Sequence, residues 1–353
     1  MLAELSLITV GIAARQPDRW WFSPRRGHPQ LDTLRDVMHL QRQRINNFTP
    51  ALLLIGHWLE IAGWCLIAAH HGWWGWGLAA LAGAVKMRHL QEVSHFAVHG
   101  VLTRSSRLST LLAEATVHLP LGFVPVPVRQ QRHVREHHPN ATVAGADPNL
   151  ADLHDAGMHP GVSTAHFLRA TLYPLTLSGL TSTLRGITSN LRTSPAPGWR
   201  TTMFLIVPIA IGWTLGWQAV VFVFVIPRLL LYPQLAWMSL LVEHRWFDAE
   251  PVTGPPAVVE AARCLRLYPR NPVLALLARA TWLPYGDLYH YAHSAHPAVR
   301  WNYLPALERV IGSPAYTPDA LVLGKGSVLR RHHVALAAQH PQQAHQRQLV
   351  RSA

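Results

Sequence analysis

Histidine is the residue whose number and spacing in this chain could do chemistry. The 353 residues include 23 histidines, and many of them gather in a few short stretches. The densest stretch reads "HVREHH" at 133–138, and others lie at 89–99, at 244 and at 290–296. Imidazole nitrogens bind iron, zinc, copper and nickel. The stretches are therefore candidate metal-binding segments.

Within these stretches the histidines recur at helical spacing. Residues three or four apart share one face of an α-helix, so each such pair can direct two imidazoles at one point. The set is larger than one tetrahedral ion can use, and two ions sharing it would account for the number. The candidate ligands are His95, His99, His133, His137, His138, His244, His290, His293 and His296.

Long apolar runs are the elements that would position these histidines. Residues 50–69 can span a bilayer, which takes about 20 helical residues, and a second run over about 75–92 follows a short tryptophan-rich turn. A second hairpin covers about 201–240. The sequence predicts an all-α integral membrane protein, with four transmembrane helices in two hairpins and a cytoplasmic helical cap that holds the histidine stretches.

The distribution of positive charge predicts the orientation. The formal net charge is +13, yet no Lys or Arg occurs over 51–85 or 201–227. By the positive-inside rule both hairpin tips face outward and both termini are cytoplasmic, and we expect a multi-pass protein of the plasma membrane. The predicted organisation is a cytoplasmic N-terminal segment over 1–48, a membrane domain over 49–312 and a basic cytoplasmic tail over 313–353, of which residues 325–353 are expected to be mobile.

Two further features concern the membrane region. The apolar stretch 109–128 contains Glu114, His118 and three prolines, which favours an interfacial or re-entrant segment over a fifth span. His57 and Glu60 lie inside the first span, where ionisable groups are costly and often functional. They could hydrogen-bond each other, line a substrate channel or form a structural pair.

The histidine stretches and hairpins together resemble the membrane fatty acid desaturase superfamily over about residues 45–312. The similarity rests on "HVREHHPNATVAGADPN", on "EH" at 243–244 and on "HPAVRWNYLPAL". It implies a non-haem di-iron centre that uses O2 to remove hydrogen from an unactivated C–H bond, with desaturation of a fatty acyl or related lipid as the reaction. The ligands that it carries over are His95, His133, His137, His138, His244, His290 and His293.

The sequence departs from the family pattern at two positions. Gln91 stands where the first stretch usually opens with a histidine, and His99 or His89 could replace it. Ser294 follows His293 where the family usually has adjacent histidines, so either His296 serves instead or one iron gains water. These departures leave hydroxylation of a lipid or specialised metabolite open as an alternative reaction.

The resemblance also implies partners. Electrons would come from an external ferredoxin- or cytochrome-like donor and its reductase, and the arginine-rich face could dock an acidic carrier or attract anionic lipid. Nucleic acid is not expected, because no binding motif accompanies the charge. A metal-binding transporter is an alternative of another class, but its ligands should lie near the membrane midplane.

Overall fold

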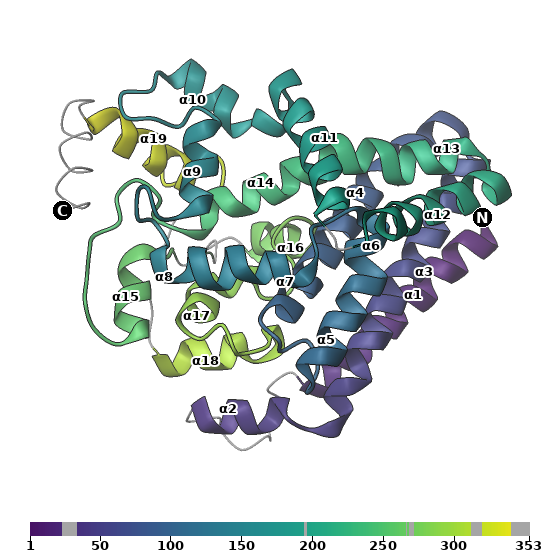
Figure 1. Ribbon diagram of the computed structural model, residues 1–353, viewed down its shortest axis with the longest axis horizontal. Helices are drawn as coiled ribbons and strands as arrows, with labels where there is room; N and C mark the ends of the chain where they lie inside the picture. Colours follow the sequence, from purple (N-terminus) through teal and green to yellow (C-terminus); the bar gives the residue numbers. More distant parts are fainter. Residues whose placement is uncertain (23–33, 194–195, 266, 268–271, 312–319, 340–353) are drawn as a thin grey trace.

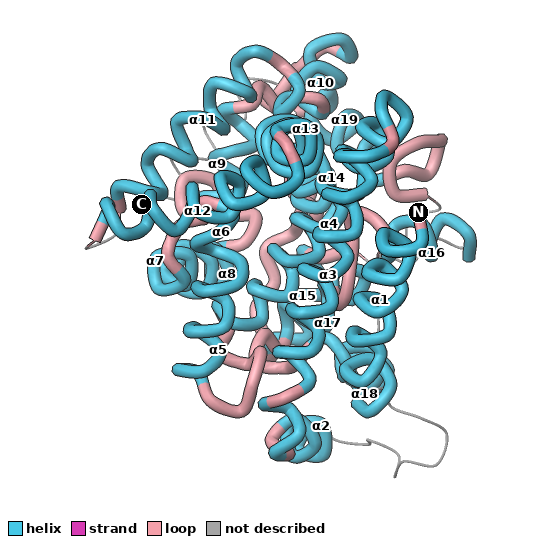
Figure 2. The backbone as a smooth tube through the Cα atoms, turned by 90° about the vertical axis from the view of Figure 1, so that its right-hand side faces the viewer, coloured by secondary structure: helices cyan, strands magenta, loops and turns pink. Residues whose placement is uncertain are grey.

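The computed structural model describes the chain apart from residues 23–33, 194–195, 266, 268–271, 312–319 and 340–353 (Figure 1). The described residues form helices and loops, and no strand is drawn among them (Figure 2). Extended pairing within this part of the chain is limited to isolated bridges, of which one joins His244 to Cys264. The all-α class is thus confirmed.

The first predicted hairpin consists of α3 (Thr49–His70) and α4 (Gly72–Val98). Gly72 turns the chain between them at a φ of +60°, a left-handed conformation that glycine adopts without strain. Because α4 continues past the predicted apolar run, the first histidine stretch lies on the same rigid helix as the apolar residues.

Helix α1 (Leu2–Phe22) lies antiparallel against α3. A Cβ atom on Gly11 would lie 2.6 Å from the carbonyl oxygen of Gly56, so only glycine permits this close approach. At one end of the pair, a ring nitrogen of His70 lies 3.1 Å from the Glu4 carboxylate. The N-terminus therefore lies at the end of α3 that is remote from the histidine stretches. The N-terminus and the first hairpin tip thus lie at the same end of α3. The predictions of a cytoplasmic N-terminus and of an outward-facing tip therefore cannot both hold.

The second hairpin consists of α12 (Pro197–Leu215) and a longer helix over Trp217–Glu243, with Gly216 at the turn. The longer helix is not uniform. Its parts are α13 (Trp217–Val220), the π-helical turns η5 (Val221–Val225) and η6 (Pro227–Leu231), and α14 (Tyr232–Glu243). Pro227 lacks the amide hydrogen that a regular helix needs, which fits a wider turn at that position.

Two helices among the described residues are long and apolar enough to cross a membrane, Arg44–His70 and Trp217–Glu243. Helix α4 carries Lys86, Arg88 and Glu92 in its second half, which lowers its apolar character. A membrane protein is supported, whereas the four-span topology and the cytoplasmic cap stay predictions.

The stretch predicted to be interfacial or re-entrant is sharply bent. The helices Ser106–Leu121 and Val126–Asn140 meet at 97° and together pass the same length and composition test, as a broken span or a re-entrant loop would. Gly122 occupies the break with a φ of +63°. The bend agrees with the prediction of an interfacial or re-entrant segment. The depth of this segment in the membrane remains a prediction. The elements here are α5 (Ser106–Ala113), η2 (Glu114–His118), α6 (Leu119–Leu121) and α7 (Val126–Gln130).

The remaining elements outside the histidine stretches are shorter helices. They are α2 (Leu34–Gln41), η1 (Arg44–Asn47), α9 (Pro148–Asp155), α10 (Thr164–Thr171), η4 (Tyr173–Leu175), α11 (Leu177–Arg192), α15 (Pro256–Arg263), α16 (Pro272–Ala280), η7 (Asp287–Tyr289), η8 (Trp301–Tyr303), α18 (Leu304–Ile311) and α19 (Val328–Ala338).

The expectation of a mobile C-terminal tail is wrong for α19. Leu336 is fully buried, and the buried His332 contacts the Leu241 carbonyl at 2.8 Å. The helix therefore packs against α14. Residues 312–319 and 340–353 of the predicted tail lie outside the described residues.

Candidate metal centre

Five imidazoles from three parts of the chain meet at one point. They come from the end of α4, from the π-helical turn η3 (Gln131–His137) with α8 (His138–Asn140), and from α17 (His290–Ala295). One ring nitrogen of each lies within 4.8 Å of the others. We call this set the first histidine group: His95, His99, His133, His138 and His293.

The nitrogens of this group face one another at short range. The Nε2 of His95 lies 2.6 Å from that of His133 and 3.1 Å from that of His99. His138 Nε2 lies 3.1 Å from His133 Nε2. The ring of His293 lies 4.7 Å from that of His95, and neither of its buried nitrogens has a hydrogen-bond partner among the described residues. Converging nitrogen lone pairs in a buried space fit a metal cation.

The π-helical geometry of η3 corrects one predicted pairing. The spacing of His133 and His137 predicts two imidazoles directed at one point on an α-helix. In η3 the turn is wider, and residues five apart share a face, so His133 is paired with His138 in the first group. His137 is left to face elsewhere.

A second group of potential ligands lies beside the first. His244, Cys264 and His290 offer atoms that lie within 4.8 Å of one another, with 3.1 Å between the Nε2 atoms of the two histidines. The ring of His137 lies 5.3 Å from that of His244, and its buried Nε2 has no hydrogen-bond partner among the described residues. We call His137, His244 and His290 the second histidine group.

The histidine stretches at 133–138 and 290–296 each contribute residues to both groups. His290 and His293 were predicted to aim at one point, but their rings are 5.8 Å apart and belong to different groups. His137 and His138 are divided in the same way. Two ions at adjacent positions would therefore be held by the same two chain segments.

Three side chains hold histidine rings in position by contacting their Nδ1 atoms. The Glu92 carboxylate lies 3.0 Å from His95 Nδ1, and the Asp147 carboxylate lies 2.9 Å from His137 Nδ1. Such contacts fix the tautomer and leave Nε2 free to bind a metal. Cys264 Sγ lies 3.4 Å from His244 Nδ1. Residue type and spacing alone indicate no role for these three residues, although Asp147 stands inside the "ADPN" motif.

A third cluster of potential ligands, Glu92, His95 and Asp287, has a different explanation. The Arg88 guanidinium binds the Glu92 carboxylate at 3.1 Å and also pairs with Asp287. A single buried arginine thus pairs with both buried carboxylates, and we assign this cluster to ion pairing.

Burial keeps these histidines in the form that binds metal. It lowers the pKa of His133, His138, His244, His290 and His293 well below the usual value, and neighbouring histidines lower the pKa further. The imidazoles are therefore neutral at physiological pH, as metal ligands must be.

The remaining candidates are placed elsewhere. His296 is half-buried and belongs to neither group. His89 contacts the carbonyl of Ala280 at 3.0 Å and lies outside both groups, whereas His99 lies in the first group. Of the two candidates to replace Gln91, the geometry favours His99. His57 hydrogen-bonds to Tyr285, and not to Glu60 as one of the predictions had it.

A cavity of about 570 Å³ reaches the first histidine group. Its lining residues include His95 and His133 and, from α14, Trp237 and Leu240. Arg132 and Asp152, each about half exposed, form an ion pair of 2.6 Å among its lining residues. A substrate could therefore reach the histidines through a space with both apolar and charged walls.

The comparison with protein families decides the identity. The family model described as "Fatty acid desaturase" matches residues 71–321, which include both histidine groups. The chain belongs to the fatty acid desaturase family. No curated protein and no solved structure matches it in the corresponding comparisons.

Family membership confirms several predictions from the sequence. This fatty acid desaturase family member is an oxidoreductase, and its chemistry is lipid desaturation or a related reaction. Members generally depend on two irons and use lipid substrates and electron donors, and the histidine groups suit metal binding. The transporter alternative is not favoured.

Proposed function

We propose that the protein is an O2-dependent desaturase of a fatty acyl chain or related lipid, with a di-iron centre in the two histidine groups. The observation that carries the proposal is the convergence of eight histidines on two adjacent points, with buried ring nitrogens that have no partner among the described residues. A pair of irons held there would supply O2 activation and removal of hydrogen from a C–H bond.

The two groups would hold the metals differently. The first group would hold one iron with five imidazoles. The second group would hold the other with His137, His244 and His290. Asp147 keeps His137 Nδ1 engaged at 2.9 Å, so its Nε2 is the nitrogen available to the metal. Glu92 does the same for His95 in the first group.

The cavity beside the first group is the proposed substrate site. Tyr173, Trp237 and Leu240 offer apolar surface for a chain, and His95 and His133 are the ligands nearest the substrate. Arg132 and Asp152 offer polar contacts to a carrier or head group at the same site. The substrate would enter chain first and leave its polar part among these residues.

Hydroxylation is the second candidate reaction, and the polar lining of this cavity supports it as an alternative. Arg129, Asn149 and Asp155 also line the space, so a smaller polar substrate could be bound there. The second histidine group has fewer imidazoles than the first, which leaves room for water at that iron. Desaturation removes two hydrogens from the substrate, whereas hydroxylation adds an oxygen atom.

The proposed partners are an external ferredoxin- or cytochrome-like donor with its reductase. The proposed location is the plasma membrane, with four spans and the histidine groups on the cytoplasmic side. Protease protection in sealed vesicles, with tags after residue 71 and after residue 216, tests whether both hairpin tips face outward.

The experiment for the reaction combines iron analysis with product analysis. The purified protein should bind iron and, with O2 and a reducing system, convert an acyl substrate into a product that mass spectrometry identifies as desaturated or hydroxylated. His137→Ala should lose iron and turnover, whereas the control His296→Ala should keep both. Turnover without iron, or retention of both by His137→Ala, would refute the proposal.

A further inference from the structure

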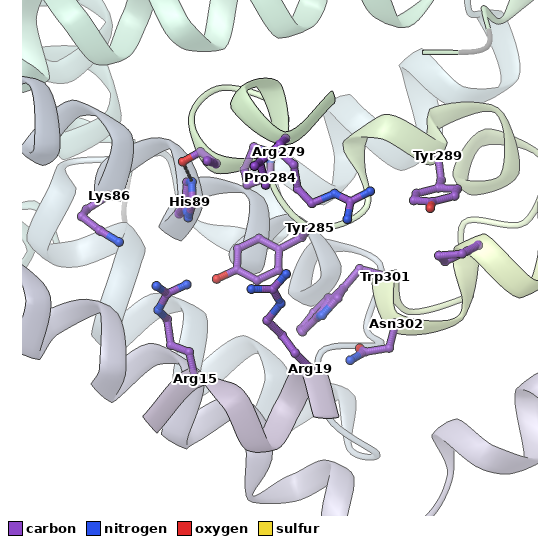
Figure 3. Close-up of a pocket in the computed structure, with 13 residues that line it drawn as sticks. Arg15, Arg19, Lys86, His89, Arg279, Pro284, Tyr285, Tyr289, Trp301 and Asn302 are labelled. Atoms are coloured by element: carbon purple, nitrogen blue, oxygen red, sulfur yellow. Dashed lines mark hydrogen bonds between the residues drawn. The ribbon is translucent and has the colours of Figure 1, made fainter. Parts of the chain in front are cut away.

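A second cavity, of about 310 Å³, lies on the other side of α4, between α1 and the residues around α16 (Figure 3). Four basic side chains line it, and its described lining residues include no Asp or Glu. Figure 3 shows Arg15 and Arg19 beside the ring of Tyr285, with Lys86 on one side of the ring and Arg279 on the other. The four are Arg15, Arg19, Lys86 and Arg279.

The inner part of this cavity is lined by buried side chains. Lys86 is only 8% exposed and His89 only 7%. Glu60 pairs with Lys86 and, at 2.5 Å, with Arg15, so one carboxylate is shared by two cations. Arg19 and Arg279 add positive charge at the exposed mouth. Among the described residues that line this cavity or pair with its lining, basic side chains therefore outnumber carboxylates.

Packed aromatic rings separate this cavity from the histidine groups. The ring of Tyr285 lies 5.5 Å from that of Trp301, which lies 4.9 Å from Phe96, and Phe96 lies 5.7 Å from His293. A molecule in the cavity would not touch the metal ligands. The cavity is thus distinct from the proposed substrate site.

An exposed apolar surface lies next to the mouth. Helix α16 contributes Leu276 to the cavity, and this side chain is 65% exposed. Val273 and Leu277 of the same helix are 60% and 54% exposed. Lys86 precedes His95 by nine residues on α4, about 14 Å along the helix. Basic groups beside exposed leucines are typical of sites that bind lipid head groups.

We propose that this cavity binds the acidic head group of an anionic amphiphile, a carboxylate or a phosphate, while its hydrocarbon chain lies along the exposed face of α16. Guanidinium and ammonium groups would donate charge-assisted hydrogen bonds to the head group. The neutral or zwitterionic lipids of the bilayer would gain less from an excess of positive charge.

The test uses the full-length protein in a neutral detergent, titrated with didecanoyl phosphatidate, with decanoate and with didecanoyl phosphatidylcholine. A ligand that binds the folded state raises the thermal unfolding midpoint, here by a few °C at saturation. We expect stabilisation by phosphatidate, by decanoate or by both, which identifies a phospholipid, a fatty acid or either as the source of the acidic group.

The variants locate the effect. Arg19→Gln with Arg279→Gln removes two exposed charges at the mouth and should weaken binding about tenfold or more. The control Arg330→Gln, an exposed arginine on α19, should bind as the unaltered protein does. The proposal is overturned if neither acid stabilises the protein, if phosphatidylcholine stabilises it equally, or if the double variant keeps its affinity.

Discussion

The two histidine groups lie side by side but are built differently. The first has five imidazoles, one of them, His95, oriented by a carboxylate. The second has three imidazoles, of which His137 contacts Asp147 and His244 contacts the thiol of Cys264. The first group can by itself surround an ion. The second leaves positions to other ligands, so it should depend more on the residues that orient its few histidines.

Loss of a ligand from the first group should have the largest effect. His138→Ala leaves the first group with four histidines. It also removes a ring that helps to enclose the ion of the neighbouring second group. We expect turnover to fall about 100-fold or more and iron content to drop clearly, measured by product formation and elemental analysis. His154→Ala, half-buried and outside both groups, is the control. An unchanged iron content in His138→Ala would show that the first group does not hold an iron.

The second group should be weakened selectively through Asp147. In Asp147→Asn the carboxylate that orients His137 is lost, and removal of such a contact typically costs 10–100-fold in metal affinity or activity. We expect one iron to be lost more readily than the other during dialysis against a chelator. The control is Asp152→Asn in α9, whose side chain is about half exposed and lies outside both groups. Equal loss of both irons would mean that the two groups do not differ as proposed.

Cys264 should have a smaller effect. Its thiol donates to the Glu260 carboxylate at 3.4 Å, and burial raises its pKa well above the usual value. The protonated thiol thus helps to position His244 and need not bind iron. Cys264→Ser should reduce iron affinity less than about tenfold, and the Mössbauer spectrum should show no loss of a thiolate ligand. A large change in isomer shift would instead make Cys264 a ligand of the second group.

A buried histidine outside both groups sharpens the comparison further. Burial lowers the pKa of His332 to about 4, against about 6.5 in an unfolded chain. Above pH 6.5 the histidine is neutral in both the folded and the unfolded state. As the pH falls from 6.5 toward 4, the unfolded state binds a proton that the folded state does not, so the free energy of unfolding decreases. At pH 5 the loss is about 2 kcal/mol.

His332→Gln should therefore flatten the pH dependence of the thermal unfolding midpoint between pH 7.5 and 5, with iron content unchanged. A variant that keeps the same pH dependence as the unaltered protein would show that His332 is not the group responsible. Loss of iron in this variant would contradict its placement outside both groups.

Much of the fold could be predicted because apolar length and glycine turns act locally. The runs at 50–69 and 201–240 correspond to α3 and to the α12–α14 hairpin. The packing of α1 could not be predicted in the same way. It depends on glycines at residues 11 and 56 meeting across the two helices, a contact between residues far apart in the sequence.

The candidate ligands were found from residue type, but their division into groups was not. Spacing rules assume a regular α-helix, and the π-helical turn at Gln131–His137 changes which histidines share a face. Asp147 and Cys264 were not assigned because each orients a histidine through a contact formed only in the folded chain. His296 fitted the spacing pattern, yet the chain turns after Ala295 and leaves it outside both groups.

The central claim is tested most directly by counting irons per chain and resolving them by Mössbauer spectroscopy. The account predicts two irons in the purified protein, in two distinguishable nitrogen-rich environments, with the more weakly held one lost from Asp147→Asn. A protein that is fully active with no iron or with a single iron, or two irons that survive replacement of both His138 and His137, would contradict it.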